Sequence, residues 1–190
     1  MRLEPIDRPP TLLARVAGAM MRRQLGKVIT PARVIYNRVP RMYNVAWQLV
    51  KLQREGLTLE PDLKLLVQVW VAMVNRCTFC VDIARSEAVR EQIGLAKFDA
   101  LPDWRTSPLF GDRERAALAY ADEATRNKKV ADPTFEALRK HFSEREIVEL
   151  TFLNALENFY NLLNLPLGIE DDGLCAIAQA RAGERLQPES

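Results

Sequence analysis

Apolar residues recur at intervals of three and four positions along most of the chain, which is the spacing of amphipathic helices. Prolines at positions 9, 10, 31 and 40 separate the first helical segments, because proline interrupts a helix. No segment alternates apolar and polar residues as a half-buried strand does. The pattern therefore predicts an all-α fold with almost no sheet. The segments with the clearest helical spacing are 11–25, 40–53, 78–93, 112–125 and 147–163.

One further helix is predicted to be apolar on every side. It opens at Glu60-Pro61-Asp62, with proline in the first turn and acids near the positive end of the helix dipole. Its apolar stripe is completed on the other sides by more apolar residues. Such a helix belongs in the middle of a bundle or in a subunit interface. The residues of the stripe are Leu63, Leu66, Val67, Trp70 and Val74.

Several helix boundaries can be predicted from local signals. Gly94 is expected to end segment 78–93 as the glycine that follows a helix. Asp132 and Pro133 are expected to start a helix that carries Phe135, Leu138 and Phe142. Ser143-x-x-Glu146 matches a capping box before the long segment 147–163, which Pro166 and Gly168 would end.

Length and composition favour one folded domain with an appended arm. The chain has 190 residues, of which 48% are hydrophobic and 27% charged, as in ordinary globular proteins. No apolar run reaches the length of a membrane span, so we expect no membrane partner. Glu4 and Asp7 occupy positions where a signal peptide would be basic, so we expect a cytoplasmic location.

The charges divide the chain into two parts. Residues 1–56 hold 11 Lys or Arg against 3 acids, whereas residues 57–190 hold 16 against 22. This asymmetry can indicate a nucleic-acid surface, but no glycine- or aromatic-interleaved basic motif accompanies it, and we do not expect nucleic acid binding. We interpret 1–56 as an N-terminal basic helical arm packed on a helical core domain, 57–190, or on an acidic neighbouring subunit.

Cys77 and Cys80 form the most distinctive chemical motif, Cys-x-x-Cys. At positions i and i+3 near a helix start, both sulfurs would face the same way and could form a disulfide. A helix N-terminus and the neighbouring Arg76 would lower the thiol pKa. This redox interpretation requires the sulfurs to be reachable from solvent.

Two other interpretations of the cysteines remain open. Free cysteine is often a small buried apolar residue, so the pair could simply fill the core. A zinc site would have to recruit Cys175 and the sole histidine, His141, from distant positions, and we expect no metal.

Asparagines at positions 154, 158 and 161 draw a polar stripe along the helix predicted for 147–163. They could line a pocket or bond neighbouring helices, and we favour the structural role. His141, next to Phe142 and just before the capping box, is likewise explained by packing at a helix end.

Several motifs occur in an order that resembles the carboxymuconolactone decarboxylase and AhpD-like alkylhydroperoxidase superfamily. The resemblance covers roughly residues 57–170 and extends more weakly to the arm. It implies an AhpD-like all-α bundle that forms dimers, trimers or hexamers. The motifs are Leu59-Glu60-Pro61, Asn75 to Asp82, Asp112 to Leu118, Phe142-Ser143, Glu149 to Thr151 and Asn158 to Asn161.

The resemblance also implies an activity without a bound cofactor. In the peroxidase members the second cysteine attacks a peroxide and the first resolves the sulfenic acid as a disulfide, which a partner dithiol reduces. Carried over to this chain, Cys80 would be the attacking thiol and Cys77 the resolving thiol. The substrate would be a small peroxide or disulfide.

The sequence departs from the family at the proton relay. Leu65 stands where the family has a glutamate, and Ala84 where it has a histidine. Loss of general acid–base help typically slows a reaction by about 10²–10⁴-fold, so a weak peroxidase is expected. Asp82 and Glu87 are the nearest acids that could substitute.

The missing relay motivates an alternative of another class, a non-enzymatic oligomeric scaffold or binding protein on the same fold. A decarboxylase is less favoured, because that branch does not depend on a dithiol and this chain has one histidine.

Overall fold

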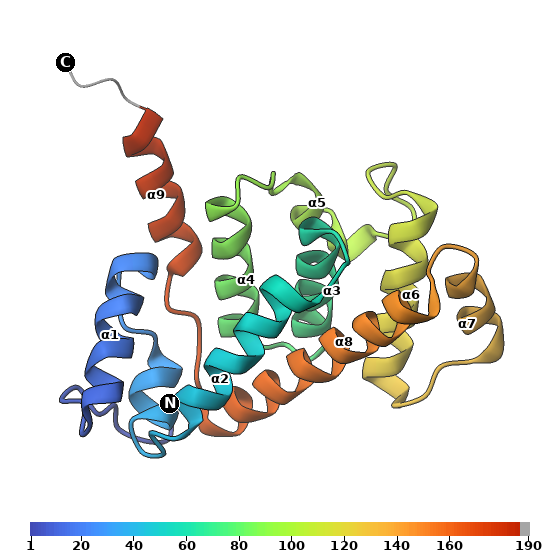
Figure 1. Cartoon of the computed structure of the whole chain (residues 1–190). Helices are drawn as coiled ribbons and strands as arrows, with labels where there is room; N and C mark the ends of the chain where they lie inside the picture. The colour runs from blue at the N-terminus through green and yellow to red at the C-terminus, as the bar shows by residue number, and fades with distance from the viewer. Residues whose placement is uncertain (187–190) are drawn as a thin grey trace.

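The computed structural model describes residues 1–186, with side chains described up to residue 183, and this part of the chain is helical without a strand (Figure 1). The all-α prediction is confirmed. No described helix is long and apolar enough to cross a membrane. The α-helices are α1 (Leu12–Leu25), α2 (Met42–Lys51), α3 (Pro61–Val74), α4 (Thr78–Arg90), α5 (Ala96–Asp99), α6 (Asp112–Asn127), α7 (Asp132–Arg139), α8 (Glu144–Asn164) and α9 (Leu174–Leu186). Short turns of other helix types are η1 (Ala32–Tyr36), η2 (Leu52–Gly56), η3 (Leu101–Asp103) and η4 (Leu165–Leu167).

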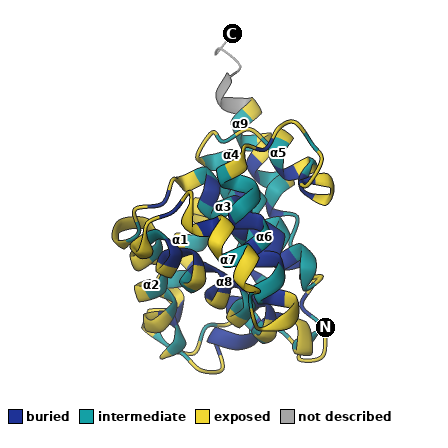
Figure 2. Ribbon diagram, turned by 90° about the vertical axis from the view of Figure 1, so that its right-hand side faces the viewer, coloured by how far each residue is buried: buried dark blue, intermediate teal, exposed yellow. Residues whose placement is uncertain are grey.

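Helix α3 lies at the centre of the bundle, where it packs against α4, α6 and α8. Proline at its first position and Asp62 in its first turn start the helix as expected. Half of its residues are buried, and they lie on more than one side of the helix (Figure 2). The prediction that an all-round apolar helix occupies the middle of the bundle is confirmed.

The buried apolar residues form two clusters. The first is built mainly by α3, α6 and α8, with Leu66, Leu118 and Leu153 among its members. The second joins the N-terminal part of the chain to both residues of the Cys-x-x-Cys motif. Its members include Ala14, Ile29, Ala32, Val34, Ile35, Tyr36, Tyr43, Ala72, Cys77, Phe79 and Cys80.

Ion pairs connect the basic N-terminal segment to acids of the later part of the chain. Lys27 lies 2.9 Å from Asp172, whose carboxylate also accepts hydrogen bonds from the backbone and hydroxyl of Thr30. Arg54 pairs with Glu87 of α4 at 2.6 Å. These contacts hold the N-terminal segment against α4 and the loop before α9.

Most predicted boundaries agree with the structure, and two are wrong. The capping box forms: Glu146 accepts from the backbone N–H of Ser143, and Gly168 adopts a left-handed φ of 64° after α8. Gly94, however, does not end α4.

Helix α4 ends at Arg90, and Gln92 takes the left-handed conformation with φ 58°. The Ile93 N–H then donates to the Ala88 carbonyl at 2.8 Å, the bond of a Schellman turn. Ile93 packs against the first cluster, so tertiary burial places the turn earlier than the glycine. Phe142 also lies outside its predicted helix, because α7 ends at Arg139.

Candidate active site at the start of helix α4

The Cys-x-x-Cys motif lies at the turn between α3 and α4. Arg76 takes a left-handed φ of 60°, and the Cys77 N–H donates to the Ala72 carbonyl at 2.9 Å. This turn makes Cys77 the N-cap of α4 and places Cys80 in its first turn. The two cysteines form a disulfide with their Cα atoms 5.3 Å apart, as the i, i+3 spacing allows.

Both sulfur-bearing residues are buried, which differs from the expectation that they face solvent. Cys77 is 0% and Cys80 3% exposed. The physical reason is the second apolar cluster, in which residues of the N-terminal segment cover the start of α4.

A surface hollow of about 500 Å³ nevertheless reaches Cys77. It lies over the start of α4 and the start of α9, and it contains both basic and acidic side chains. Solvent therefore has a route to the neighbourhood of the disulfide. The residues that line the hollow are Met73, Arg76, Cys77, Thr78, Val81, Asp82, Arg85, Asp171 and Cys175.

On the other side, the disulfide meets a buried polar face of α8. The Asn164 side-chain amide donates to the Cys80 sulfur at 3.4 Å. One turn earlier, the Asn161 amide donates to the Glu157 carboxylate at 2.6 Å. Asn75, at the end of α3, donates to the side-chain oxygen of Asn161 at 2.7 Å. The cluster thus joins α3, α4 and α8.

The asparagine stripe has the structural role that the sequence favoured. Asn154 donates to the Ala121 carbonyl at 3.2 Å and to the Thr125 hydroxyl at 2.8 Å, which ties α8 to α6. Asn158 accepts from Asn75 at 3.0 Å, which ties α8 to α3.

Glu157 is the residue of this face that the sequence analysis missed. It is 5% exposed, and burial raises its pKa to about 8, although the hydrogen bond from Asn161 acts in the opposite direction. The signal was present in the sequence, because Glu157 lies three residues after Asn154 and four before Asn161. An acid inside a predicted buried stripe should have been treated as part of it.

The structure gives the two substitute acids other partners. The Asp82 carboxylate accepts backbone N–H groups of Asp172, Leu174 and Cys175 at 2.8 to 3.1 Å, and so holds the start of α9 on α4. Glu87 pairs with Arg54 and with Arg90. Each carboxylate is therefore engaged in holding helices together.

The positions of the missing relay hold apolar, partly buried side chains. Leu65 and Ala84 are partly buried against the first apolar cluster, whereas both cysteines belong to the second. Neither side chain can donate or accept a proton, so neither does the work of the family's glutamate or histidine.

Of the two remaining candidate ligands, Cys175 lies near the disulfide and His141 does not. His141 is exposed after α7, where its carbonyl accepts from Arg113. Cys175 is a free thiol that lines the same hollow as Cys77. Within the described residues, no three His, Cys, Asp or Glu side chains form a group that could hold a metal ion.

Comparison with known proteins places this geometry in a family context. Residues 39–123 match the profile of the carboxymuconolactone decarboxylase family. The uncharacterised protein YnjA of Escherichia coli strain K12 is 36% identical over 185 residues, which are 96% of this chain and all of YnjA.

Solved structures share the fold. A protein of unknown function from Agrobacterium tumefaciens, described as a candidate antioxidant defence protein AhpD, is 27% identical with a TM-score of 0.67, covering 73% of this chain and 97% of that one. A cysteine-to-alanine variant of the debrominase Bmp8, bound to 2,3,4-tribromopyrrole, has a TM-score of 0.80 at 18% identity, covering 96% and 97%.

Proposed function

This chain belongs to the carboxymuconolactone decarboxylase and AhpD-like superfamily, and on that premise we propose that it is a thiol-dependent oxidoreductase. The observation that carries the proposal is the Cys77–Cys80 disulfide at the start of α4, beside a hollow that reaches Cys77. The substrate is a small peroxide or disulfide, and a partner dithiol supplies the electrons.

The peroxide reaction proceeds in three balanced steps. The Cys80 thiolate attacks one peroxide oxygen, the O–O bond breaks, and the leaving alkoxide takes up a proton to become an alcohol. The Cys77 thiol then attacks the sulfenic acid sulfur, which forms the disulfide and releases water. Finally, the partner dithiol is oxidised to a disulfide as it reduces Cys77 and Cys80.

Two features of the site support a thiolate at the start of α4, and the second singles out Cys80 as the attacking thiol. The N-terminus of α4 carries unpaired backbone N–H groups and a positive dipole end, which stabilise a thiolate. The Asn164 amide donates directly to the Cys80 sulfur at 3.4 Å, and such a bond favours the charged form. Because the relay is absent and both sulfurs are buried, we expect the reaction with peroxide to be slow.

The proposal is tested by removing each sulfur in turn. We expect Cys80→Ser to reduce peroxide consumption to the buffer rate, because the attacking thiol is then absent. Cys77→Ser, the matched variant, should still consume one peroxide per chain and leave a sulfenic acid that dimedone traps at Cys80. Mass mapping of the trapped peptide reads out both results. Peroxide consumption that survives Cys80→Ser would overturn the assignment.

The burial of both cysteines favours a second candidate, the non-enzymatic scaffold or binding protein. In that case neither peroxide nor a small disulfide would change the redox state of the pair faster than it changes free cysteine. The same peptide mapping on the wild-type protein separates the two functions.

A further inference from the structure

The buried acid of α8 has no part in the reaction described above, yet it belongs to the same polar cluster as the attacking thiol. The Glu157 carboxylate accepts from Asn161 at 2.6 Å, and Asn161 accepts from Asn75 at 2.7 Å. Further along the same face, Asn164 donates to the Cys80 sulfur. The acid and the sulfur thus lie at the two ends of one short row of amides.

The spacing along α8 separates Glu157 from Asn164, the residue whose amide contacts the Cys80 sulfur. Glu157 and Asn164 are seven residues apart, nearly two helical turns, so they share a face and lie about 10 Å apart along the axis. Over about 10 Å with an effective dielectric constant of about 20, one charge shifts the pKa of another by about one pH unit. The charges of Glu157 and Cys80 therefore influence each other measurably.

The described groups around Glu157 do not compensate a negative charge on its carboxylate. No ion pair joins it to a lysine or arginine in residues 1–183. Burial raises the pKa of Tyr160, and it raises the pKa of Tyr36 to about 12, so both phenols keep their protons near neutral pH. The titratable or polar groups that face this part of α8 are Tyr160 of α8, Tyr36 of η1, Thr125 of α6, Asn75 after α3 and Cys80 of α4.

We propose that Glu157 is a positioning residue of the dithiol centre, coupled to Cys80 so that a negative charge on either group disfavours ionisation of the other. A protonated Glu157 permits the Cys80 thiolate, and ionisation of either group raises the pKa of the other. The inference rests on the proposed function in one respect: it takes Cys80 to be the thiol that ionises.

The test compares two titrations in the reduced protein. The first follows Cys80 through its alkylation rate by iodoacetamide against pH, with peptide mapping to separate it from the other thiols. The second follows the Glu157 carboxyl through carbon-13 NMR of glutamate-labelled protein, with Glu157→Gln to assign its resonance. Cys80 is also titrated in Glu157→Gln, and Glu157 in Cys80→Ser.

Coupling predicts that whichever group ionises second in the wild type has its pKa about one pH unit above its value in the variant that lacks the other group. Glu149→Gln is the matched control, because it removes another buried carboxylate of α8 that bonds the backbone of Thr58 and Leu59. It should leave both titrations unchanged. Agreement of both wild-type pKa values with those of the variants within 0.2 units would overturn the inference.

The outcome is independent of peroxide chemistry. Coupling in a protein that consumes no peroxide would leave this inference standing and remove the peroxidase proposal. Peroxide consumption without coupling would leave the peroxidase proposal standing and overturn this inference. Circular dichroism of each variant verifies that the helices are intact.

Discussion

At the scale of single residues, Glu157 combines an energetic cost with a place on the same face of α8 as Asn164, whose amide contacts Cys80. Burial takes its carboxyl away from water, and a single amide donor from Asn161 compensates only in part. Glu149, also buried on α8, is in the opposite condition: Arg145 and the backbone N–H groups of Thr58 and Leu59 hold its pKa below the usual range against the effect of burial. The Glu157 carboxyl therefore favours its neutral form, and the Glu149 carboxyl favours its charged form.

The Glu157 carboxyl makes the stability of the protein depend on pH. Its pKa is about 8 in the folded state against 4.5 in the reference state, so the folded chain holds this proton more tightly. The stabilisation of the folded state that comes from this tighter proton binding is fully present below about pH 4.5 and is lost as the pH rises through about 8.

We therefore expect Glu157→Gln to raise the free energy of unfolding by about 2–4 kcal/mol at pH 8 and by nearly nothing at pH 4. Urea unfolding at the two pH values measures the difference. An equal change at both values would show that the variant acts through packing and not through the proton.

At the scale of helices, carboxylates at helix starts hold the bundle in register. Glu146 accepts from Ser143 in the capping box of α8 and pairs with Arg113 of α6 at 2.6 Å. Asp82 of α4 accepts the first N–H groups of α9 in the same manner. Because unpaired N–H groups at a helix start need acceptors, each of these acids fixes where a helix begins and what it packs on.

The capping box should give α8 a measurable acid sensitivity. The hydrogen bond from Arg113, with those from Ser143, lowers the pKa of Glu146 to about 2 from 4.5. The stabilisation is present above about pH 4.5 and is lost as the pH falls towards 2.

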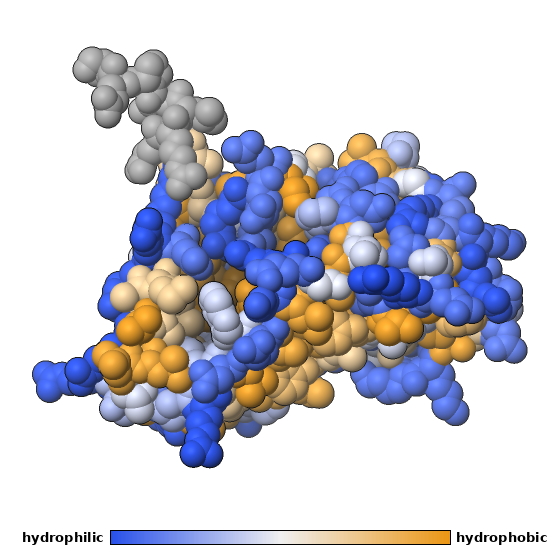
Figure 3. All heavy atoms as spheres, viewed as in Figure 1, coloured by the Kyte–Doolittle hydropathy of each residue, from blue (hydrophilic) through white to orange (hydrophobic). Residues whose placement is uncertain are grey.

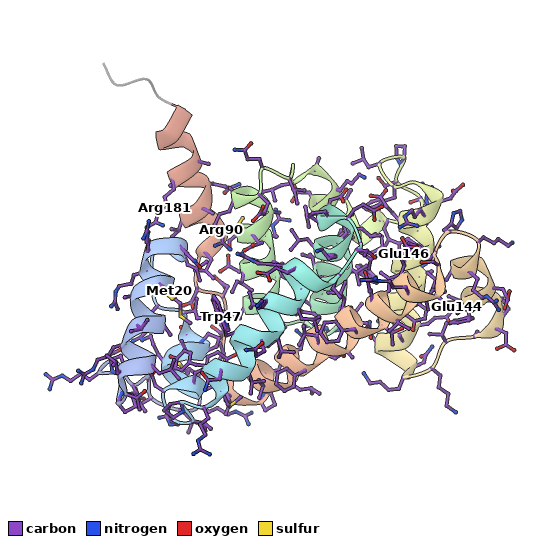
Figure 4. All side chains as sticks on the ribbon, viewed as in Figure 1. Met20, Trp47, Arg90, Glu144, Glu146 and Arg181 are labelled. Carbon is purple, nitrogen blue, oxygen red and sulfur yellow. A yellow bond between two sulfur atoms is a disulfide. The ribbon has the colours of Figure 1, made fainter. Side chains whose placement is uncertain are left out.

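We expect Glu146→Ala to lower the free energy of unfolding by about 1–3 kcal/mol at pH 7, with a much smaller difference near pH 2. Glu144→Ala is the matched control, because Glu144 lies in the same first turn but is exposed (Figure 4). Chemical denaturation at pH 7 compares the two. Equal losses in both variants would mean that the helix dipole, and not the capping box, accounts for the effect.

At the scale of the whole molecule, large apolar side chains remain exposed on α1, α2 and α8. Figure 3 shows hydrophobic residues gathered over this side, and Met20 and Trp47, labelled in Figure 4, are 41% and 56% exposed. On α8, Val148 and Leu162 are also exposed. Exposed apolar side chains grouped on one side are typical of an interface, and because the family resemblance implies an oligomer, we propose that a second copy of this chain covers them.

This proposal predicts that the purified protein is a homo-oligomer and that Trp47→Glu or Leu162→Glu shifts it towards the monomer. A buried glutamate in an apolar interface loses its hydration without gaining a partner, which opposes association. Leu109→Glu, at an exposed apolar residue in the loop before α6, is the matched control. Light scattering coupled to size exclusion measures the mass, and a wild-type monomer at all concentrations would contradict the proposal.

The sequence by itself determined the helices and most of their limits, and it showed that Cys77 and Cys80 lie close enough along the chain to pair. These features follow from local rules: apolar spacing, capping residues such as Ser143 and Glu146, and the reach of two side chains at i and i+3. The tertiary structure alone decided that the N-terminal segment covers the sulfurs, that Gln92 and not Gly94 makes the turn after α4, and that Glu157 shares a cluster with Cys80. These depend on which helices pack together, and helical periodicity shows which face is buried without showing what buries it.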